Sequence, residues 1–188
     1  VWAASPDGSD RRSIYRSPRG FADNAALSRD GRFVALGTNT TTKPLVVAAT
    51  DGSGHRDLLR RHPQITRVGV FGWSPDRRRL AFEGFVGKGR QQSVFLFTIR
   101  RDGTDLRRHQ QLQTDPRLSA DSGALAWTSR GIVYPDARHI WLLQLDGRRR
   151  LLLSNSSLGE VRASGDGRRV FYSIVSSRVT GDSARLFR

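Results

Sequence analysis

The 188-residue sequence predicts an all-β fold, a β-propeller of four-stranded antiparallel blades with about four blade equivalents. Two observations predict this fold. A turn motif followed by an apolar triplet recurs at a regular interval, and an Asp-Gly motif alternates with it along the chain. The two motifs together place four short strands in each period of about 45 residues, which is typical of a propeller blade.

The first motif is a small polar residue, any residue, Asp, and an apolar triplet that begins four residues after the Asp. Its copies are residues 28–36, 74–82, 119–127 and 164–172, with Asp30, Asp76, Asp121 and Asp166 spaced by 46, 45 and 45 residues. Ser and Asp side chains bond nearby backbone N–H groups, so the motif predicts a β-turn with one strand before it and the triplet in the strand after it. Gly31 follows the Asp of the first copy, where positive φ is expected, and Arg77 holds the same position in the second copy. Positive φ at a non-glycine residue should cost on the order of 1 kcal/mol.

The second motif is an apolar strand that ends in Asp-Gly and continues into a polar, Arg-rich stretch. Its copies are residues 45–59, 94–108 and 140–153. Asp-Gly between two strand-like runs is a strong hairpin signal, and it predicts a type I′ turn with positive φ at both central residues.

The N-terminal SPDG at residues 5–8 belongs to the second motif. Four residues after Asp7 the chain reads Arg-Arg-Ser instead of an apolar triplet. Asp7 precedes Asp51 by 44 residues, the interval that also separates Asp102 from Asp146. Val1–Arg16 is therefore expected to form a two-stranded hairpin.

The motifs assign the chain to a single propeller domain, or to a segment of a larger propeller. The expected divisions are 1–18 for the last two strands of a blade, 19–62, 63–111 and 112–156 for three blades, and 157–188 for the first three strands of another. The chain begins with Val and contains no Met, and we expect it to be a slice of a longer protein.

Residues 73–76 (WSPD), followed by 80–82 (LAF), 94–97 (VFLF) and 102–106 (DGTDL), resemble the TolB-type β-propeller repeat, also called the WD40-like or PD40 repeat. Only Trp73 precedes its turn in the manner of that family. The resemblance implies an extracytoplasmic location (periplasmic, secreted or envelope-attached) and a role in protein contacts. Related propellers accompany prolyl-oligopeptidase-type hydrolases, so the alternative is the propeller part of a larger hydrolase whose catalytic domain lies outside this chain.

The formal net charge of +15 indicates an anionic partner such as an acidic protein surface or polymer. The alternative is an arginine-biased, solvated surface. The arginines lack the interleaved aromatic residues that stack bases in single-strand binders, so sequence-specific nucleic-acid binding is not expected. No apolar run reaches the length needed to span a membrane.

Blades repeat by rotation, so equivalent hairpins should fall on the same part of the disc. Several hairpins have Arg-rich tips, such as Arg100-Arg101. The repeated position of the hairpins predicts a basic arc near one rim. The candidate partner-binding residues are Arg11, Arg12, Arg56, Lys88, Arg107, Arg108, Arg148 and Arg149. Lys88 lies in an irregular Gly-rich stretch, residues 84–92, which we expect to be a rim loop.

We predict no catalytic, cofactor-binding or metal-binding residues. The chain has no Cys, which excludes thiolate metal sites and a Cys nucleophile. It also lacks the G-x-S-x-G and H-E-x-x-H motifs, and its four histidines show no ligand spacing. The expected function is therefore a non-enzymatic scaffold for protein–protein interaction that needs no cofactor; a binder of an anionic polymer through an Arg-rich rim is a further alternative.

Overall fold

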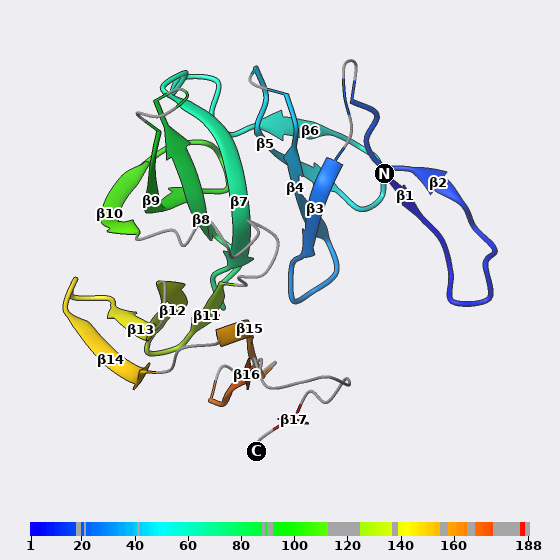
Figure 1. Cartoon of the computed structure of the whole chain (residues 1–188). Helices are drawn as coiled ribbons and strands as arrows, with labels where there is room; N and C mark the ends of the chain where they lie inside the picture. The colour runs from blue at the N-terminus through cyan, green and yellow to red at the C-terminus, as the bar shows by residue number, and fades with distance from the viewer. Residues whose placement is uncertain are drawn as a thin grey trace, which may run out of the picture.

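The computed structural model describes residues 1–17, 20, 22–40, 42–87, 89, 92–112, 125–136, 139–154, 158–164, 168–174 and 185–186. These residues form antiparallel sheets that follow one another along the chain. In Figure 1 the sheets stand side by side as blades in an arc that runs from the N-terminal hairpin to β17. The predicted all-β fold of four-stranded antiparallel sheets is confirmed.

The N-terminal hairpin consists of β1 (Trp2–Ala3) and β2 (Arg12–Ser13), which pair antiparallel. The amide of Gly8 donates to the carbonyl of Ser5 at 2.8 Å, so the SPDG sequence forms the turn of this hairpin. The predicted hairpin over Val1–Arg16 is confirmed.

Three sheets have four strands each, in the order of the sequence. The first blade contains β3 (Ala22–Leu27), β4 (Phe33–Thr38), β5 (Leu45–Ala49) and β6 (His55–Asp57). The second blade contains β7 (Ile65–Trp73), β8 (Arg79–Val86), β9 (Ser93–Arg100) and β10 (Arg107–Leu112). The third blade contains β11 (Ala126–Thr128), β12 (Gly131–Asp136), β13 (His139–Gln144) and β14 (Arg149–Ser154). The C-terminal sheet contains β15 (Leu158–Ala163), β16 (Val170–Ile174) and β17 (Arg185–Leu186).

The Ser-x-Asp turn forms as predicted in the first and second blades. In the second blade the Ser74 hydroxyl donates to Asp76 Oδ1 at 2.6 Å and accepts from the Arg79 amide at 2.9 Å. Ser28 makes the same two bonds in the first blade. Arg77 occupies the left-handed region with φ of 62°, the position that Gly31 holds with φ of 70°.

The prediction for the third copy of the first motif is wrong. Residues 125–127 were expected in the second strand of a blade, but β11 is the edge strand of its sheet and pairs with β12. β11 also packs against β7 and β15, the first strands of the neighbouring sheets. The true turn joins Thr128 to Gly131, and the expected turn at 119–123 lies outside the described residues. This turn is shorter and carries no Asp.

The predicted type I′ geometry of the Asp-Gly turns is also wrong. Gly103 has φ of 84°, whereas Asp102 is not among the residues with positive φ. The Gly103 amide donates to the Arg100 carbonyl at 2.9 Å, and the Arg100 amide donates to Thr104. This is the pattern of a three-residue loop with a left-handed glycine. The Asp102 carboxylate accepts the Thr104 amide at 2.9 Å, which favours this turn over type I′.

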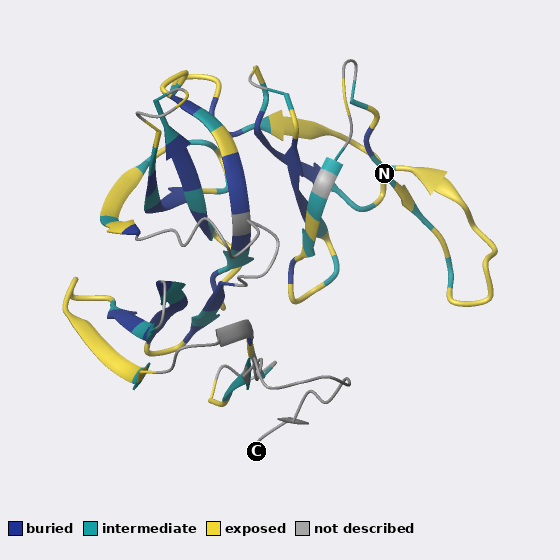
Figure 2. Ribbon diagram, in the orientation of Figure 1, coloured by how far each residue is buried: buried dark blue, intermediate teal, exposed yellow. Residues whose placement is uncertain are grey.

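The hydrophobic core lies between the sheets. Along β4, Val34 and Leu36 pack toward the N-terminal hairpin, whereas Ala35 packs toward the second blade. This alternation explains the continuous apolar triplets, because a central strand is covered on both faces. Figure 2 shows buried residues along the central strands and exposed residues along outer strands such as β6 and β14. In the described part of the chain, no helix has the length and hydropathy needed to cross a membrane.

Candidate partner-binding face

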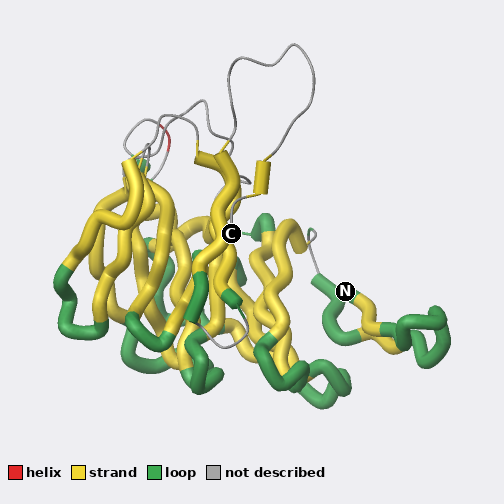
Figure 3. The backbone as a smooth tube through the Cα atoms, turned by 90° about the horizontal axis from the view of Figure 1, so that it is seen from below, coloured by secondary structure: helices red, strands yellow, loops and turns green. Residues whose placement is uncertain are grey.

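The turns of the first and second motifs lie at the same end of each sheet. The first motif joins the first and second strands of a blade and the second motif joins the third and fourth, and in an antiparallel sheet these two connections lie at one end. Figure 3 shows most of the described turns along one side of the molecule, the turn face. In the second blade the two turns are bonded directly, since the Arg101 amide donates to the Arg78 carbonyl at 2.8 Å. In the first blade the Thr50 amide donates to Arg32 in the same way, at 3.0 Å.

The two turns of the second blade enclose a pocket of about 390 Å³, which we call the arginine pocket. Its lining residues are Asp76, Arg78, Arg79, Arg100, Arg101 and Asp102. The lining therefore includes four arginines and two aspartates. The arrangement gives this part of the turn face a net positive charge.

Asp105 organises the arginines on one side of the arginine pocket. Its carboxylate lies 2.7 Å from Arg79 Nη1, 3.6 Å from Arg100 Nε and 2.9 Å from Arg107 Nε. The hydrogen bonds from Arg107 and Arg79 lower the pKa of Asp105 to about 2. The guanidinium of Arg78 makes no ion pair or hydrogen bond with any residue that the structure describes, so it is the group best placed to meet a ligand.

The two carboxylates of the arginine pocket are already occupied by their own turns. Hydrogen bonds from the Thr104 hydroxyl and amide lower the pKa of Asp102. Burial raises the pKa of Asp76, but hydrogen bonds from Ser74 and the Arg78 amide outweigh it, and the net shift is downward. Both carboxylates are therefore ionised at neutral pH, and their acceptor oxygens hold the backbone in place.

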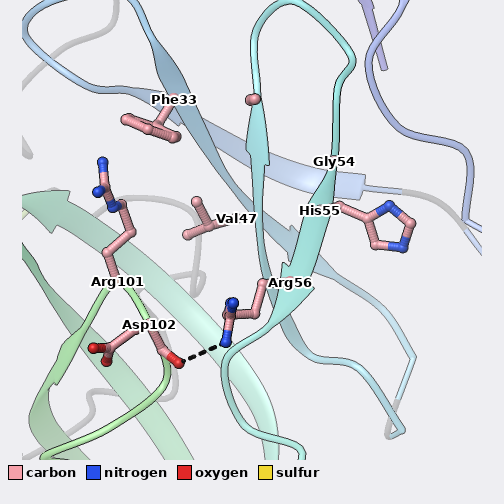
Figure 4. A pocket seen from close by; sticks show the side chains of 8 residues that line it. Phe33, Val47, Gly54, His55, Arg56, Arg101 and Asp102 are labelled. Atoms are coloured by element: carbon pink, nitrogen blue, oxygen red, sulfur yellow. Dashed lines mark hydrogen bonds between the residues drawn. The ribbon is translucent and has the colours of Figure 1, made fainter.

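A second pocket, of about 340 Å³, lies between the first and second blades; we call it the interblade pocket. It is lined by Phe33, Val47, Ala49, Gly54, His55, Arg56, Arg101 and Asp102. Arg101 Cζ stands 3.9 Å from the centroid of the Phe33 ring, and Arg56 Nη1 donates to the Asp102 carbonyl at 3.3 Å. Figure 4 shows Arg101 reaching toward Phe33, and the His55 ring turned away from Val47.

Two of the predicted partner-binding residues connect neighbouring sheets. Arg12 Nε donates to the Thr50 carbonyl at 2.9 Å, and Arg56 reaches Asp102 in the equivalent way one blade later. Both arginines stand five residues after the Asp of their own hairpin. Their position in the repeat thus serves blade-to-blade contact. Arg11 is exposed on the N-terminal hairpin.

The other predicted residues that the structure describes do not line either pocket. Arg107 is paired with Asp105, and Arg108 lies over the Phe95 ring at 5.0 Å. Arg149 lies over the Trp141 ring at 3.9 Å, and Arg148 is 3.7 Å from Asp146. Lys88 is outside the described residues. Of the seven that the structure describes, only Arg56 lines one of the two pockets, and the basic arc stays a prediction.

The eight predicted residues do not include Arg78 and Arg79, and they do not include Arg100 and Arg101, which are predicted only as an Arg-rich tip. The two turns of a blade lie at the same end of its sheet, so arginines from both motifs meet there. A signal was available, since Arg-rich runs follow both Asp76 and the strand before Asp102. Among the described residues, no cluster of three or more His, Asp or Glu residues could hold a metal ion.

No family model matches the sequence, and a search of curated proteins found no match. Among solved structures, a chain of a nidogen/laminin complex is 22% identical with a TM-score of 0.65, over 92% of this chain and 63% of that chain. TolB from Acinetobacter baumannii is 14% identical with a TM-score of 0.68, over 98% of this chain and 44% of that chain.

The β-propeller domain of the trilobed protease from Pyrococcus furiosus is 15% identical with a TM-score of 0.61, over 98% of this chain and 57% of that chain. This chain spans less than two-thirds of each of these three proteins. At these identities the likeness concerns the fold. The chain has the β-propeller fold that these proteins share.

Proposed function

We propose that this chain is a non-catalytic, TolB-like propeller scaffold that binds an acidic protein partner on its turn face. The observation that carries this proposal is the arginine pocket, which is lined by four arginines and by two carboxylates that are engaged by their own turns. Asp105 pairs with Arg79 and Arg100, which leaves Arg78 and Arg101 for a ligand. The planar guanidinium forms paired hydrogen bonds with carboxylates. An acidic protein segment would meet this geometry, and the Arg78 guanidinium forms no hydrogen bond or ion pair with the described residues.

The proposed location is extracytoplasmic, in the bacterial cell envelope. Its support is the resemblance of residues 73–82 to the TolB-type repeat, together with the structural likeness to TolB. Fractionation of cells that produce the whole protein tests this location; recovery in the cytoplasmic fraction alone would contradict it.

The binding test uses the 188-residue chain and fluorescein-labelled poly-L-glutamate, followed by fluorescence anisotropy at increasing salt. We expect saturable binding that weakens with salt, because the interaction is electrostatic. Replacing Arg78 and Arg101 by alanine should weaken binding about tenfold, since each exposed ion pair contributes up to about 1 kcal/mol.

The matched control is the double variant Arg60→Ala and Arg61→Ala, which removes the same charge from exposed positions outside both pockets. It should change affinity by less than about twofold. Equal weakening by both double variants would refute a specific site. Equally tight binding of single-stranded DNA of matched charge would point instead to an anionic-polymer binder.

A second candidate is the propeller part of a larger hydrolase, which the likeness to the trilobed protease propeller favours. Its catalytic residues would lie outside these 188 residues. The coding sequence next to this segment tests it. A G-x-S-x-G motif there, with the strand and helix that present the serine, supports this candidate; its absence from the whole protein rejects a hydrolase of this type.

A further inference from the structure

The arginine pocket and the interblade pocket adjoin one another. Both are lined by Arg101 and Asp102, so they share a wall at the boundary between the first and second blades, and we call the pair of pockets the groove. Its two ends differ in chemistry. The arginine pocket presents Arg78, Arg79 and Arg100, whereas the interblade pocket presents the apolar side chains of Phe33, Val47 and Ala49.

Gly54 leaves the apolar end of the groove uncovered. A Cβ atom built on Gly54 would meet no atom within 4 Å, so the space beside it is empty. The position lies three residues after the Asp of the hairpin, and the other three hairpins carry Asp10, Asp105 and Arg149 there.

Arg101 joins the two ends of the groove. Its guanidinium stands over the Phe33 ring, with Cζ 3.9 Å from the centroid. Stacking on an aromatic face holds the guanidinium plane while its N–H groups remain directed outward in that plane. A carboxylate could therefore bind Arg101 beside an apolar side chain that contacts Val47 and Ala49.

We propose that the groove binds an extended acidic segment of the partner that carries one apolar side chain next to its carboxylates. The apolar side chain occupies the interblade pocket, whose volume of about 340 Å³ accommodates a leucine or phenylalanine side chain. The carboxylates bind Arg78 and Arg101. The inference rests on the proposed function and adds to it the sequence character of the ligand.

The test compares two synthetic nonapeptides bound to the 188-residue chain. Both have eight glutamates, and the central residue is leucine in one and glycine in the other. We expect the leucine peptide to bind about fivefold more tightly, because its side chain leaves water on binding. Equal affinities would overturn this inference and leave the proposed function intact, whereas failure of both peptides to bind would overturn the proposed function itself.

Gly54→Phe should fill the interblade pocket without a backbone clash. We expect this variant to lose the preference for leucine and to bind the two peptides with equal affinity. Gly54→Ala should reduce the preference partly. Ser53→Phe, which adds the same ring at an exposed neighbour that does not line the pocket, should keep it.

Thermal unfolding of each variant checks that the fold is retained. Independently of the variants, NMR shifts of the Val47 and Ala49 methyl groups should respond to the leucine peptide and not to the glycine peptide. A leucine preference that survives Gly54→Phe in a folded protein, or methyl shifts that are the same with both peptides, would refute the inference.

Discussion

The second and third blades share one topology but hold their first turn by different chemistry. In the second blade the Ser74 hydroxyl accepts from the Arg79 amide at 2.9 Å, five residues along, and Asp76 caps the loop between them. In the third blade the Thr128 hydroxyl donates to the Gly131 carbonyl at 3.0 Å, three residues along. Both hydroxyl residues are buried. The feature common to the blades is therefore a buried hydroxyl that bonds to the returning chain, and the Asp belongs only to the longer turn.

The longer turn also supplies the candidate site. The residues between Ser74 and Arg79 carry Arg78 onto the turn face, beside the Asp-Gly turn of the same blade. A second difference lies three residues after the Asp of each Asp-Gly turn. The second blade has Asp105 there, which binds three arginines, and the third blade has Arg149, which lies over Trp141.

The largest effect should come from Gly131→Ala in the third blade. Gly131 has φ of 139°, and a Cβ atom there would collide with the Leu143 carbonyl oxygen. Because both atoms belong to paired strands, the backbone must shift, and we expect the free energy of unfolding to fall by about 3 kcal/mol or more. Urea denaturation measures this change.

Gly147→Ala is the matched control in the same blade. Gly147 also has positive φ, 85°, but a Cβ atom there meets nothing within 4 Å. Its cost should be about 1 kcal/mol, from the left-handed backbone alone. Equal losses for the two variants would show that the close packing of the short turn does not constrain Gly131.

Ser74→Ala should have the next largest effect. It removes the acceptor of the Arg79 amide and the donor to Asp76, at a buried position. We expect the free energy of unfolding to fall by about 1–3 kcal/mol. Thr128→Val, which preserves shape in the third blade, should cost a similar amount because it removes two hydroxyl hydrogen bonds.

The same denaturation measurements decide whether the buried hydroxyl is the common element. If Thr128→Val is neutral while Ser74→Ala is costly, the two turns are not equivalent, and the third blade depends on glycine alone. Asp76→Ala separates the roles further, because it removes the cap while the Ser74–Arg79 bond remains.

The sequence predicted the strands and sheets well where local chemistry determined them. Trp73, the Ser-x-Asp turn and the apolar triplet after it lie within a few residues of one another, so their spacing carries the structure. The prediction for the third copy is wrong because the first motif contains an Asp, whereas Thr128 and Gly131 form a turn without one. Trp127 precedes Thr128 as Trp73 precedes Ser74, and this match was the signal that could have identified the true turn.

The candidate site was harder to predict than the fold. Arg78 and Arg101 are 23 residues apart in sequence, and they share the arginine pocket because two turns of one blade are bonded through the backbone. The interblade pocket further requires Phe33 and Gly54 from another sheet. The packing between blades depends on long-range contacts that motif spacing does not encode, so the predicted basic residues included Arg12 and Arg56, which bind neighbouring turns.

The smallest effect concerns the pH dependence of stability, where the second blade should differ from the third through Asp105. The pKa of Asp105 is about 2 in the folded protein, against an ordinary value of 3.8, because Arg107 and Arg79 bond its ionised form. A lowered pKa favours folding above pH 3.8, and this contribution is lost as pH falls from 3.8 through about 2. Asp105→Asn should lower stability at neutral pH and flatten the decline of stability over this pH interval.

Asp146→Asn in the third blade, which removes a carboxylate 3.7 Å from one exposed arginine, is the control. Urea midpoints across the interval measure both variants; an undiminished decline in Asp105→Asn would show that the three arginines do not stabilise the fold through this carboxylate.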